Sequence, residues 1–454
     1  MGRVGGMGVD GKNGNPIGGK TFCAQNGIKA AVGLQEYEKT LIFANKSIKF
    51  DMKKIFCFMC FGLVWAGVIL GFIACGSSES DEKVPHIPIL GWYSIPGGAS
   101  ATLEHYQEMK DCGFDYSFAH IHNYEDAIQA LDLCAQVGLK SIFTCPELEK
   151  EPEETVQKVM NHPGLGGYFL RDEPGNDSME GLGAWARRIE SVDSIHPCYL
   201  NLLPSFVFTP DGYEEHLRLF TEKVNLPQIS FDHYPINDNN GEVFINPRWY
   251  ENLELVRSEC LRVGKPFWAF ALSTAHTPYP IPTIDHLRLQ MYSNLAYGAQ
   301  LLQYFTYWNP GTETWNFHEA PITLEGHRSP VYELVRQMNE EIQRRAFVWD
   351  GCTVESVCHV ADSVPQGTKP LTTLPAHFRK IENVSGQGLV SVITNGGRHF
   401  VMLVNTSPVQ RWHVNVETDE NVVLIRQDAT SAPVTRYDPL FILSPGNCEV
   451  FEIR

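Results

Sequence analysis

The sequence predicts a TIM-type (β/α)8 barrel followed by a small all-β sandwich, in a chain of 454 residues. Three observations support this α/β fold class. Eight β-prone runs alternate with amphipathic stretches over residues 88–348, glycines end several of those stretches, and short alternating strands follow over residues 349–454. Eight strand–helix units in about 260 residues match one barrel of this kind. A doubly wound open sheet is the alternative, but the first unit lacks its GxGxxG phosphate loop.

The expected barrel strands are short and rich in aliphatic and aromatic residues. Runs of this length and composition are typical of strands that are buried on both faces of a parallel sheet. In chain order they are Ile89–Ser94, Tyr116–Ile121, Ser141–Cys145, Gly167–Arg171, Tyr199–Leu203, Gln228–Asp232, Phe267–Leu272 and Leu301–Tyr307.

Helical stretches lie between these strands, and their apolar residues recur at intervals of three and four. Examples are residues 102–114, 125–139, 181–192 and 286–299. Gly113, Gly138 and Gly264 stand where a helix should stop before the next strand. Glycine enters the left-handed conformation at low cost, so it is a common helix terminator.

Residues 349–454 follow a different pattern, that of a β-sandwich. Six runs of alternating polarity occur at residues 389–394, 399–405, 412–417, 421–426, 440–444 and 448–453. Turn-forming groups such as Asn395-Gly396-Gly397 and Pro445-Gly446 separate them. Short, regularly spaced strands without a helical pattern predict two packed antiparallel sheets.

The N-terminal region carries the pattern of an export signal. Residues 1–51 have no sustained apolar period, and we expect them to be a non-native extension before a true start at Met52. Two lysines, an apolar run and Cys75 follow, and residues 76–87 form a polar linker. A basic start, an apolar run and small residues before a cleavage point define a secretory signal. The alternative is a single membrane anchor, since about 20 apolar residues can span a bilayer. With either a secretory signal or a membrane anchor, we expect the rest of the chain to be exported.

The segment Phe72-Ile73-Ala74-Cys75 resembles the lipobox of bacterial lipoproteins. In that family the cysteine is lipidated and becomes the first residue of the mature protein. The resemblance implies that residues 52–75 are a lipoprotein signal peptide and that Cys75 carries the lipid. We therefore expect a protein of the cell envelope that is anchored to a membrane.

Composition and charge narrow the function classes. Apolar residues make up 43% and charged residues 20% of the chain, which is a globular composition. The 36 Lys and Arg against 53 Asp and Glu give a formal net charge of −17. Phosphate backbones repel such a chain, so we expect no nucleic-acid partner. Residues 88–348 contain no glycine-rich phosphate loop, the sequence has no GxSxG nucleophile motif, and no cofactor is expected.

Acidic residues follow the fourth expected strand, at the point where TIM barrels place catalysis. Asp172 and Glu173 come directly after an apolar run, where burying carboxylates is costly unless they are paired or used. Arg171 could simply neutralise one of them in a solvated loop. The functional interpretation is that Glu173 is a general acid/base with a pKa tuned by its pocket.

Residues 167–174, GYFLRDEP, and residues 303–310, QYFTYWNP, resemble segments of (β/α)8-barrel glycoside hydrolases. In that family a glutamate after strand four is the acid/base, and strand eight carries a sugar-stacking Trp. The resemblance spans residues 88–454 and implies a glycosidase with a carbohydrate substrate.

One family feature is missing. A second glutamate usually ends strand seven, yet no Asp or Glu occurs from Leu261 to Ile284. Asp232, at the end of strand six, is one replacement. A second route uses the Asp172–Glu173 pair, because barrels that cleave 2-acetamido sugars by substrate assistance carry adjacent Asp and Glu there. A third route recruits acids from loops, which are Glu147, Glu313, Glu319 and Glu325.

Further residues at strand ends have the chemistry of a carbohydrate cleft, because aromatic faces stack on sugars and polar groups bind hydroxyls. The candidates are Trp92, Tyr93, His120, His122, Asn201, His233, Tyr234, Trp268, His276, Tyr304, Tyr307 and Trp308. A zinc site built on the His120-x-His122 pair is an alternative, but its third ligand is unspecified and we expect no metal.

The sequence therefore predicts an exported glycoside hydrolase, with Glu173 as acid/base and Asp172 or Asp232 as the second carboxylate. The alternative is a non-catalytic glycan-binding lipoprotein on a decayed barrel, which the missing strand-seven glutamate motivates. The sugar, the linkage and the oligomeric state stay open.

Overall fold

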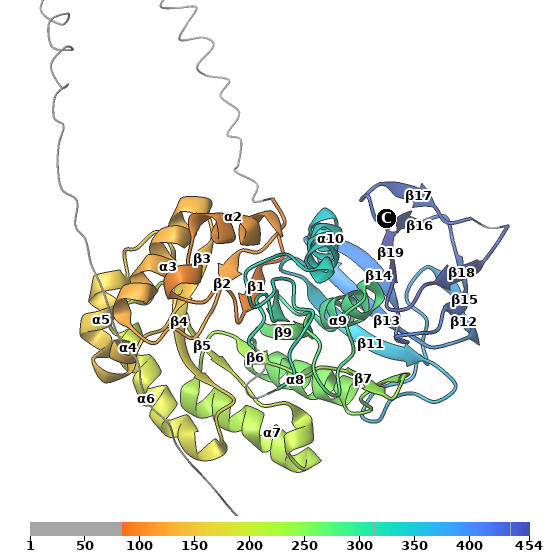
Figure 1. The fold of residues 1–454 in the computed structure, drawn as a ribbon. Helices are drawn as coiled ribbons and strands as arrows, with labels where there is room; N and C mark the ends of the chain where they lie inside the picture. Colours follow the sequence, from red (N-terminus) through yellow and green to blue (C-terminus); the bar gives the residue numbers. More distant parts are fainter. Residues whose placement is uncertain (1–83, 312–314, 436) are drawn as a thin grey trace, which may run out of the picture. The chain divides into compact units, whose positions relative to one another are not determined.

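The computed structural model describes residues 84–311, 315–435 and 437–454, and these form one compact unit. Parallel strands surrounded by helices come first, and antiparallel sheets follow (Figure 1). The expected signal peptide 52–75, its Cys75 and the extension 1–51 lie outside the described residues. Within the described ranges, no helix has the length and apolar character needed to cross a membrane.

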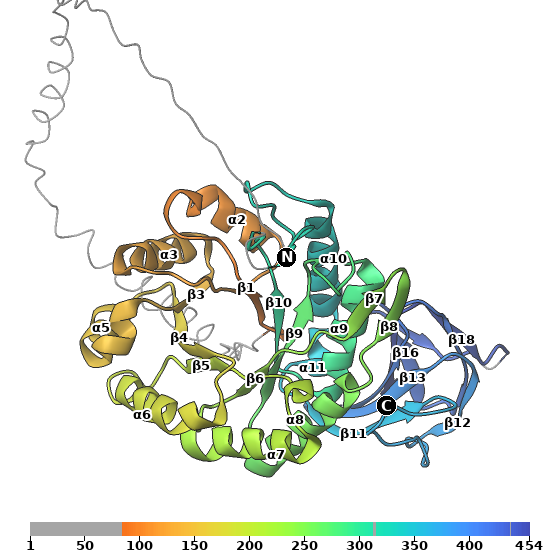
Figure 2. The same cartoon turned by 60° about the horizontal axis from the view of Figure 1, so that its bottom comes forward.

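The barrel sheet has eight parallel strands in the order β5-β4-β3-β2-β1-β10-β9-β6 (Figure 2). They are β1 (Ile89–Trp92), β2 (Tyr116–Ser117), β3 (Lys140–Phe143), β4 (Leu165–Asp172), β5 (Cys198–Asn201), β6 (Ile229–Phe231), β9 (Phe267–Leu272) and β10 (Leu301–Phe305). A parallel bridge between Leu202 and Phe231 joins the two edges, and the Leu202 N–H donates to the Ser230 carbonyl at 2.8 Å. The barrel predicted from sequence is thus nearly closed.

Some strands end earlier than their sequence pattern predicts. β2 stops at Ser117 and β10 at Phe305, where the sequence predicts strands to Ile121 and Tyr307. Beyond these points single hydrogen bonds, such as Tyr307 N–H to the Trp92 carbonyl at 3.2 Å, replace the regular ladder. The apolar residues that follow belong to loops on the C-terminal face of the barrel.

Helices cover the outside of the sheet. They are α2 (Leu103–Asp111), α3 (Tyr124–Val137), α4 (Pro146–Lys150), α5 (Pro152–Val159), α6 (Met179–Glu190), α7 (Pro210–Leu219), α8 (Trp249–Val263), α9 (Ile284–Tyr297), α10 (Pro330–Arg344) and α11 (Ala346–Trp349). The predicted glycine stops are confirmed: Gly138 and Gly264 follow α3 and α8 with φ of 74° and 69°, and Gly113 lies just past α2 with φ of 91°. At the other end, Thr283 caps α9 by accepting the His286 N–H at 3.2 Å.

Two antiparallel sheets follow the barrel. The larger one has the order β11-β13-β14-β19-β16-β17, and the smaller one has the order β12-β15-β18. Their strands are β11 (Thr353–Val360), β12 (Phe378–Ser385), β13 (Gly388–Asn395), β14 (Arg398–Asn405), β15 (Trp412–Thr418), β16 (Val422–Ile425), β17 (Ser431–Pro433), β18 (Leu440–Leu443) and β19 (Cys448–Ile453). Trp412 and Phe451 are buried between the two sheets, which is the sandwich that the alternating pattern predicts.

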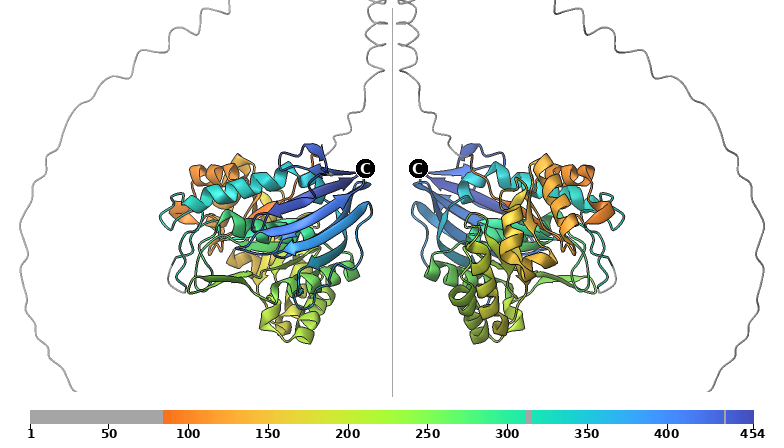
Figure 3. Two further views of the ribbon diagram at one scale, coloured as in Figure 1. Left: turned by 90° about the vertical axis from the view of Figure 1, so that its right-hand side faces the viewer. Right: turned by 90° about the vertical axis from the view of Figure 1, so that its left-hand side faces the viewer.

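The larger sheet lies against the barrel (Figure 3), and the two share one hydrophobic core. Leu289 and Tyr292 of α9 belong to the same buried cluster as Leu389 and Met402 of the sheet. The Ser391 hydroxyl also donates to the carbonyl of Ala296 in α9 at 2.7 Å. The sheet is therefore packed on the barrel rather than linked to it by a flexible segment.

Candidate active site

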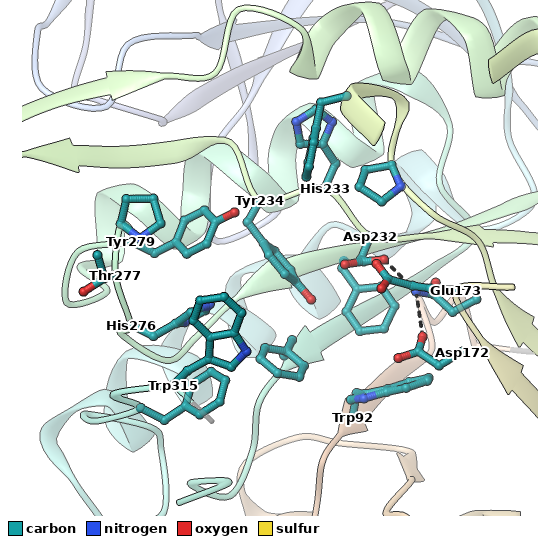
Figure 4. A pocket seen from close by; sticks show the side chains of 17 residues that line it. Trp92, Asp172, Glu173, Asp232, His233, Tyr234, His276, Thr277, Tyr279 and Trp315 are labelled. Carbon is teal, nitrogen blue, oxygen red and sulfur yellow. Dashed lines mark hydrogen bonds between the residues drawn. The ribbon is translucent and has the colours of Figure 1, made fainter. Parts of the chain in front are cut away.

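A cavity of about 540 Å³ opens at the C-terminal ends of the barrel strands. The 17 residues that line it come from the ends of strands and from the loops that follow them (Figure 4). Three of them are carboxylic acids, and among the described residues no arginine or lysine contributes to the wall. A TIM barrel places its chemistry at this face.

The three acids are Asp172, Glu173 and Asp232, the predicted catalytic residues (Figure 4). Asp172 is the last residue of β4, Glu173 follows it, and Asp232 follows β6. Strand β5 lies between β4 and β6, and its last residue, Asn201, is paired in register with Asp172. The ends of neighbouring parallel strands meet at one edge, so acids far apart in the chain come together.

Asn201 holds two of these carboxyl groups. Its Nδ2 donates to Oδ1 of Asp232 at 2.7 Å and to Oδ1 of Asp172 at 3.4 Å. An amide nitrogen carries two hydrogens, so it can serve both acceptors at once. The two aspartates are therefore oriented by one side chain.

A buried chain of hydrogen bonds fixes the orientation of the Asn201 amide. Tyr199 donates to Oε1 of Gln303 at 2.5 Å, and Nε2 of Gln303 donates to the Ser230 hydroxyl at 2.9 Å. Ser230 in turn donates to Oδ1 of Asn201 at 2.9 Å. Each donor determines the role of the next group, so Asn201 must present N–H groups to the carboxylates.

The cavity environment raises the pKa of all three acids, and desolvation by burial is the largest cause for each. Burial and the neighbouring Glu173 charge raise the pKa of Asp172 to about 7, although its hydrogen bond from Asn201 acts in the opposite direction. Burial raises the pKa of Glu173, and a hydrogen bond with Asp232 offsets part of that rise. Burial and the charges of the other two acids raise the pKa of Asp232 well above its usual range. The cluster therefore retains a proton near neutral pH, as a general acid requires.

The backbone of Glu173 has an unusual conformation. Its φ is 45°, a left-handed value that is uncommon for a residue with a side chain. The Glu173 N–H donates to the carbonyl of Asn201 at 2.9 Å, which holds the residue against the end of β5. Strained backbone of this kind is concentrated at functional sites.

Aromatic rings lie beside the acids. Trp92 is 3% exposed and its ring centroid lies 5.6 Å from that of Phe270. Tyr234 and Phe305 lie next to each other, with ring centroids 5.8 Å apart. Aromatic faces can stack on the C–H faces of a sugar while carboxylates bind its hydroxyls, so this wall has the chemistry of a carbohydrate site.

The protonation state of His233 follows from its neighbours. The Ser205 N–H donates to Oδ1 of Asn252 at 2.6 Å, and the same oxygen lies 3.2 Å from Nδ1 of His233. Nδ1 must therefore carry a hydrogen. Burial lowers the pKa of His233 to about 4, so the ring is neutral and Nε2 is an acceptor. Nε2 is buried without a hydrogen-bond partner in the described part of the chain, so it could accept a hydrogen bond from a ligand hydroxyl.

Other predicted substrate-binding residues divide into two groups. Those that line the cavity with the acids are Trp92, Asn201, His233, Tyr234 and His276. Those that do not line it are Tyr93, His120, His122, Trp268, Tyr304, Tyr307 and Trp308. The second group includes His120, whose ring nonetheless packs on Trp92 at 5.9 Å.

Side-chain direction along β10 separates Phe305 from its neighbours. The hydroxyl of Tyr304 donates to Asn339 of α10 at 2.8 Å, so Tyr304 points outward from the barrel. Tyr307 and Trp308 are buried in the same outer layer. Phe305 points the other way and lines the cavity. Trp268 is placed differently again: it stacks on Tyr199 inside the barrel at 5.4 Å, near the beginning of β9.

The end of β9 supplies no carboxylate. Ser273 donates to the carbonyl of Thr306 at 2.8 Å, and Thr274 donates to that of His318 at 3.2 Å. Both hydroxyls are used to hold neighbouring loops. The loop acids Glu147, Glu319 and Glu325 are not part of the cavity wall, and Glu313 lies outside the described residues.

Several lining residues were not predicted from the sequence. They are Pro204, Phe206, Phe270, Thr277, Pro278, Tyr279, Phe305, Trp315 and Phe317. Most lie in loops after β5, β9 and β10, where no periodic pattern marks them. The one sequence feature that could have identified the aromatic residues among them is their position just after barrel strands. In the described ranges, no group of three or more His, Cys, Asp or Glu has the arrangement of a metal site.

Comparison with solved structures finds the same fold in two glycoside hydrolases. No protein-family model and no curated protein matches the chain. The β-galactosidase from Bacillus circulans sp. alkalophilus aligns with a TM-score of 0.57 at 10% identity, over 82% of this chain and 100% of that chain. A catalytic mutant of Gan42B, a GH42 β-galactosidase from G. stearothermophilus, aligns with a TM-score of 0.52 at 10% identity, over 82% and 99%.

A third alignment is partial. The β-galactosidase from the psychrophilic Marinomonas ef1 aligns with a TM-score of 0.44 at 12% identity, over 57% of this chain and 60% of that chain. The alignment thus spans less than two thirds of that enzyme. Together the two full-length likenesses establish the fold, an eight-stranded parallel barrel followed by antiparallel sheets.

Proposed function

We propose that this protein is a glycoside hydrolase in which Glu173 is the general acid. The observation that carries the proposal is the cluster of Asp172, Glu173 and Asp232 in an aromatic-walled cavity at the strand ends of the barrel. Cleavage of a glycosidic bond needs one carboxyl group to protonate the leaving oxygen and a second group to act at the anomeric carbon. The cluster supplies both carboxyl groups, and glycoside hydrolases share the fold of this chain.

Glu173 and Asp232 share one proton. The two carboxyl groups are hydrogen-bonded to each other, which requires one proton between them. Asn201 donates to Asp232 at 2.7 Å and so stabilises its ionised form. No side-chain N–H from the described residues donates to Glu173. Asn201 thus favours the shared proton on Glu173, whereas burial and the neighbouring charges, which raise the pKa of Asp232 well above its usual range, favour it on Asp232. In the proposed reaction Glu173 takes up this proton and passes it to the leaving group.

The second carboxyl role has two assignments. Asp232 faces Glu173 and could act at the anomeric carbon directly or through a water molecule. Asp172 could instead steady the amide of a 2-acetamido sugar, whose own carbonyl oxygen then attacks the anomeric carbon. Asn201 supports both aspartates, so either is oriented for its task.

The substrate should be an uncharged or amino sugar. Three carboxyl groups line the cavity without an arginine or lysine from the described residues. A uronic acid or a sulfated sugar would bring a further negative charge to this wall, with no cation to pair with it.

The first test is sugar release by the full chain from a panel of aryl glycosides and natural oligosaccharides, beside Glu173→Gln. Loss of general-acid catalysis should lower the rate by about a hundredfold or more. Glu325→Gln is the matched control, because Glu325 is an exposed acid outside the cavity, and its rate should equal that of the wild type. Equal rates in the wild type and Glu173→Gln would contradict the proposal.

The two assignments of the second carboxyl group predict different patterns. If Asp232 acts, Asp232→Asn loses activity on all glycosides, and a thiazoline inhibitor that mimics the cyclised acetamido intermediate is weak. If Asp172 acts with the substrate amide, only 2-acetamido sugars are cleaved and the thiazoline inhibits strongly. A covalent sugar trapped on Asp232 would exclude substrate assistance.

A glycan-binding protein without activity is the second candidate function, and the absence of a carboxylate at the end of β9 favours it. In that case no sugar is released by either protein, while oligosaccharides bind equally to the wild type and to Glu173→Gln.

We also propose that the protein acts in the cell envelope, anchored through a lipid on Cys75. The support is the sequence around the polarity break at Cys75. Metabolic labelling with radioactive palmitate should label the wild type in cells but not Cys75→Ser. Equal labelling of the two would refute the anchor.

A further inference from the structure

We propose that the end of the cavity formed by the loops after β9 and β10 is a second sugar-binding subsite. It would receive an uncharged sugar ring adjacent to the one held at the carboxyl groups. This inference rests on the proposed function and extends it to the neighbouring unit of the substrate.

The subsite lies across the cavity from the acids. Figure 4 shows Tyr234 in the middle, with the carboxyl cluster on one side of it. His276, Tyr279 and Trp315 lie on the other side. The volume of about 540 Å³ for the whole cavity falls within the range of roughly 300–1,000 Å³ for pockets that bury whole ligands. We infer that one ring at the acids leaves this end free.

Hydrogen bonds between loops form the subsite before any ligand binds. Ala275 and His318 exchange both backbone hydrogen bonds, at 2.9 and 3.0 Å, and so join the loop after β9 to the loop after β10. The Thr277 N–H donates to Oδ1 of Asn316 at 3.0 Å. From strand β7 (Ile236–Asn239), which follows β6, the Asp238 N–H donates to the carbonyl of Pro278 at 2.8 Å. A preformed site of this kind costs little ordering entropy on binding.

Aromatic rings make up most of this end. The His276 ring lies 4.6 Å from the ring of Phe317 and 4.8 Å from that of Tyr279. Trp315 stands at the edge with 56% of its surface exposed. A Trp so exposed at the mouth of a cavity offers its face to a ligand, and sugar C–H faces stack on such rings.

Polar chemistry favours a sugar over a hydrocarbon group. His276 is 8% exposed, and its Nδ1 has no hydrogen-bond partner in the described residues. Burial lowers the pKa of His276 to about 4, so the ring is neutral and offers hydrogen bonding without charge. A hydroxyl group would satisfy Nδ1, whereas an alkyl chain would leave it unpaired. Among the described loop residues that line this end, His276 and Tyr279 are the only ones with an acidic or basic side chain. The sugar ring that binds there should therefore be uncharged.

The test measures binding to the full chain carrying Glu173→Gln, in which turnover does not interfere. The probes are lactose, cellobiose, maltose and N,N′-diacetylchitobiose, together with their monosaccharides, in a calorimetric titration. At least one disaccharide should bind more tightly than its monosaccharides. Adding Trp315→Ala should lower the affinity for that disaccharide about three- to tenfold, the range expected for an aromatic contact. The affinity for the monosaccharides should stay within twofold.

Matched variants keep the result interpretable. Tyr437→Ala removes a fully exposed aromatic ring from the β-sandwich and should change neither affinity. His276→Phe keeps the ring but removes its nitrogens, and it should weaken the disaccharide alone. The proposal is overturned if no disaccharide binds more tightly than its monosaccharides, or if Trp315→Ala weakens disaccharide and monosaccharide binding equally. If the wild type releases no sugar, the proposed hydrolase is refuted, but the binding measurements still decide whether the second subsite exists.

Discussion

Asn201 is the residue that lets three carboxyl groups share one wall of the cavity. Its two N–H groups face Asp172 and Asp232, and its carbonyl is engaged by Ser230. Without that orientation the amide could turn its oxygen toward the acids and add to their repulsion. Asn201 could be predicted from sequence as a strand-end polar residue. Its orientation depends on Ser230, whose position in the β6 strand gives no sign of this role.

The raised pKa of Asp172 predicts a dependence of stability on pH. The folded protein keeps this proton up to a pH of about 7, whereas the unfolded chain loses it near 4. The resulting contribution to stability is complete below pH 4 and is lost as the pH rises through 7. Asp172→Asn should therefore melt above the wild type at pH 8, by about 1–3 °C, and show no gain at pH 4. The Asp172 side chain is exposed to solvent although neighbouring groups surround it, and this exposure limits the effect.

Thermal melts followed by circular dichroism at both pH values measure this difference. Asp177→Asn is the control, because Asp177 is an exposed acid in the same loop and lies outside the cavity. An equal change in melting temperature at pH 4 and pH 8 would show that Asp172 is not the titrating group.

At the scale of elements, the turn between β18 and β19 is packed tightly against α9. Gly446 has a φ of 67°, and a Cβ added there would lie 2.5 Å from the backbone nitrogen of Leu289, besides meeting the carbonyl oxygen of Asp285. The Pro445-Gly446 pair could be predicted as a turn from sequence. Its approach to a helix more than 150 residues earlier in the chain could not, because nothing local encodes that contact.

Gly446→Ala should therefore destabilise the protein more than a glycine substitution in an open turn. Gly396→Ala is the matched control, since Gly396 also has a positive φ, 55°, with nothing within 4 Å of an added Cβ. Both changes strain the backbone, but only the first forces atoms together, and overpacking costs about 1–3 kcal/mol more. Urea unfolding measures the difference; equal losses would mean that the turn moves away from α9 without cost.

At the scale of the whole molecule, the barrel and the larger sheet are held by one core. Tyr292 of α9 lies in the same buried cluster as Met402 of β14. Arg345, which is 1% exposed, donates to the hydroxyl of Tyr292 at 3.0 Å and to Sγ of Cys448 at 3.3 Å. Separating the two parts would expose this apolar surface to water and break the hydrogen bond between Arg345 and Cys448.

We therefore expect the described part of the chain to unfold in one cooperative transition. Far-ultraviolet circular dichroism, which follows the backbone of both parts, and tryptophan fluorescence should give the same melting midpoint. Limited proteolysis just below that midpoint should release no stable barrel fragment. Two separated transitions, or a protected fragment ending near residue 348, would show that the two parts fold independently.

Local pattern is sufficient for the barrel, the sandwich and the three acids at the strand ends. These features depend on periodicity, on glycine stops and on the rule that parallel strands present their carboxyl ends at one face, all of which are visible in the order of residues. Tertiary structure alone decides which aromatic rings line the cavity. Phe305 lines it while Tyr304 and Trp308 do not, and Trp315 reaches it from a long loop. The physical reason is that strand alternation and loop-to-loop hydrogen bonds set side-chain direction, and both depend on contacts between distant parts of the chain.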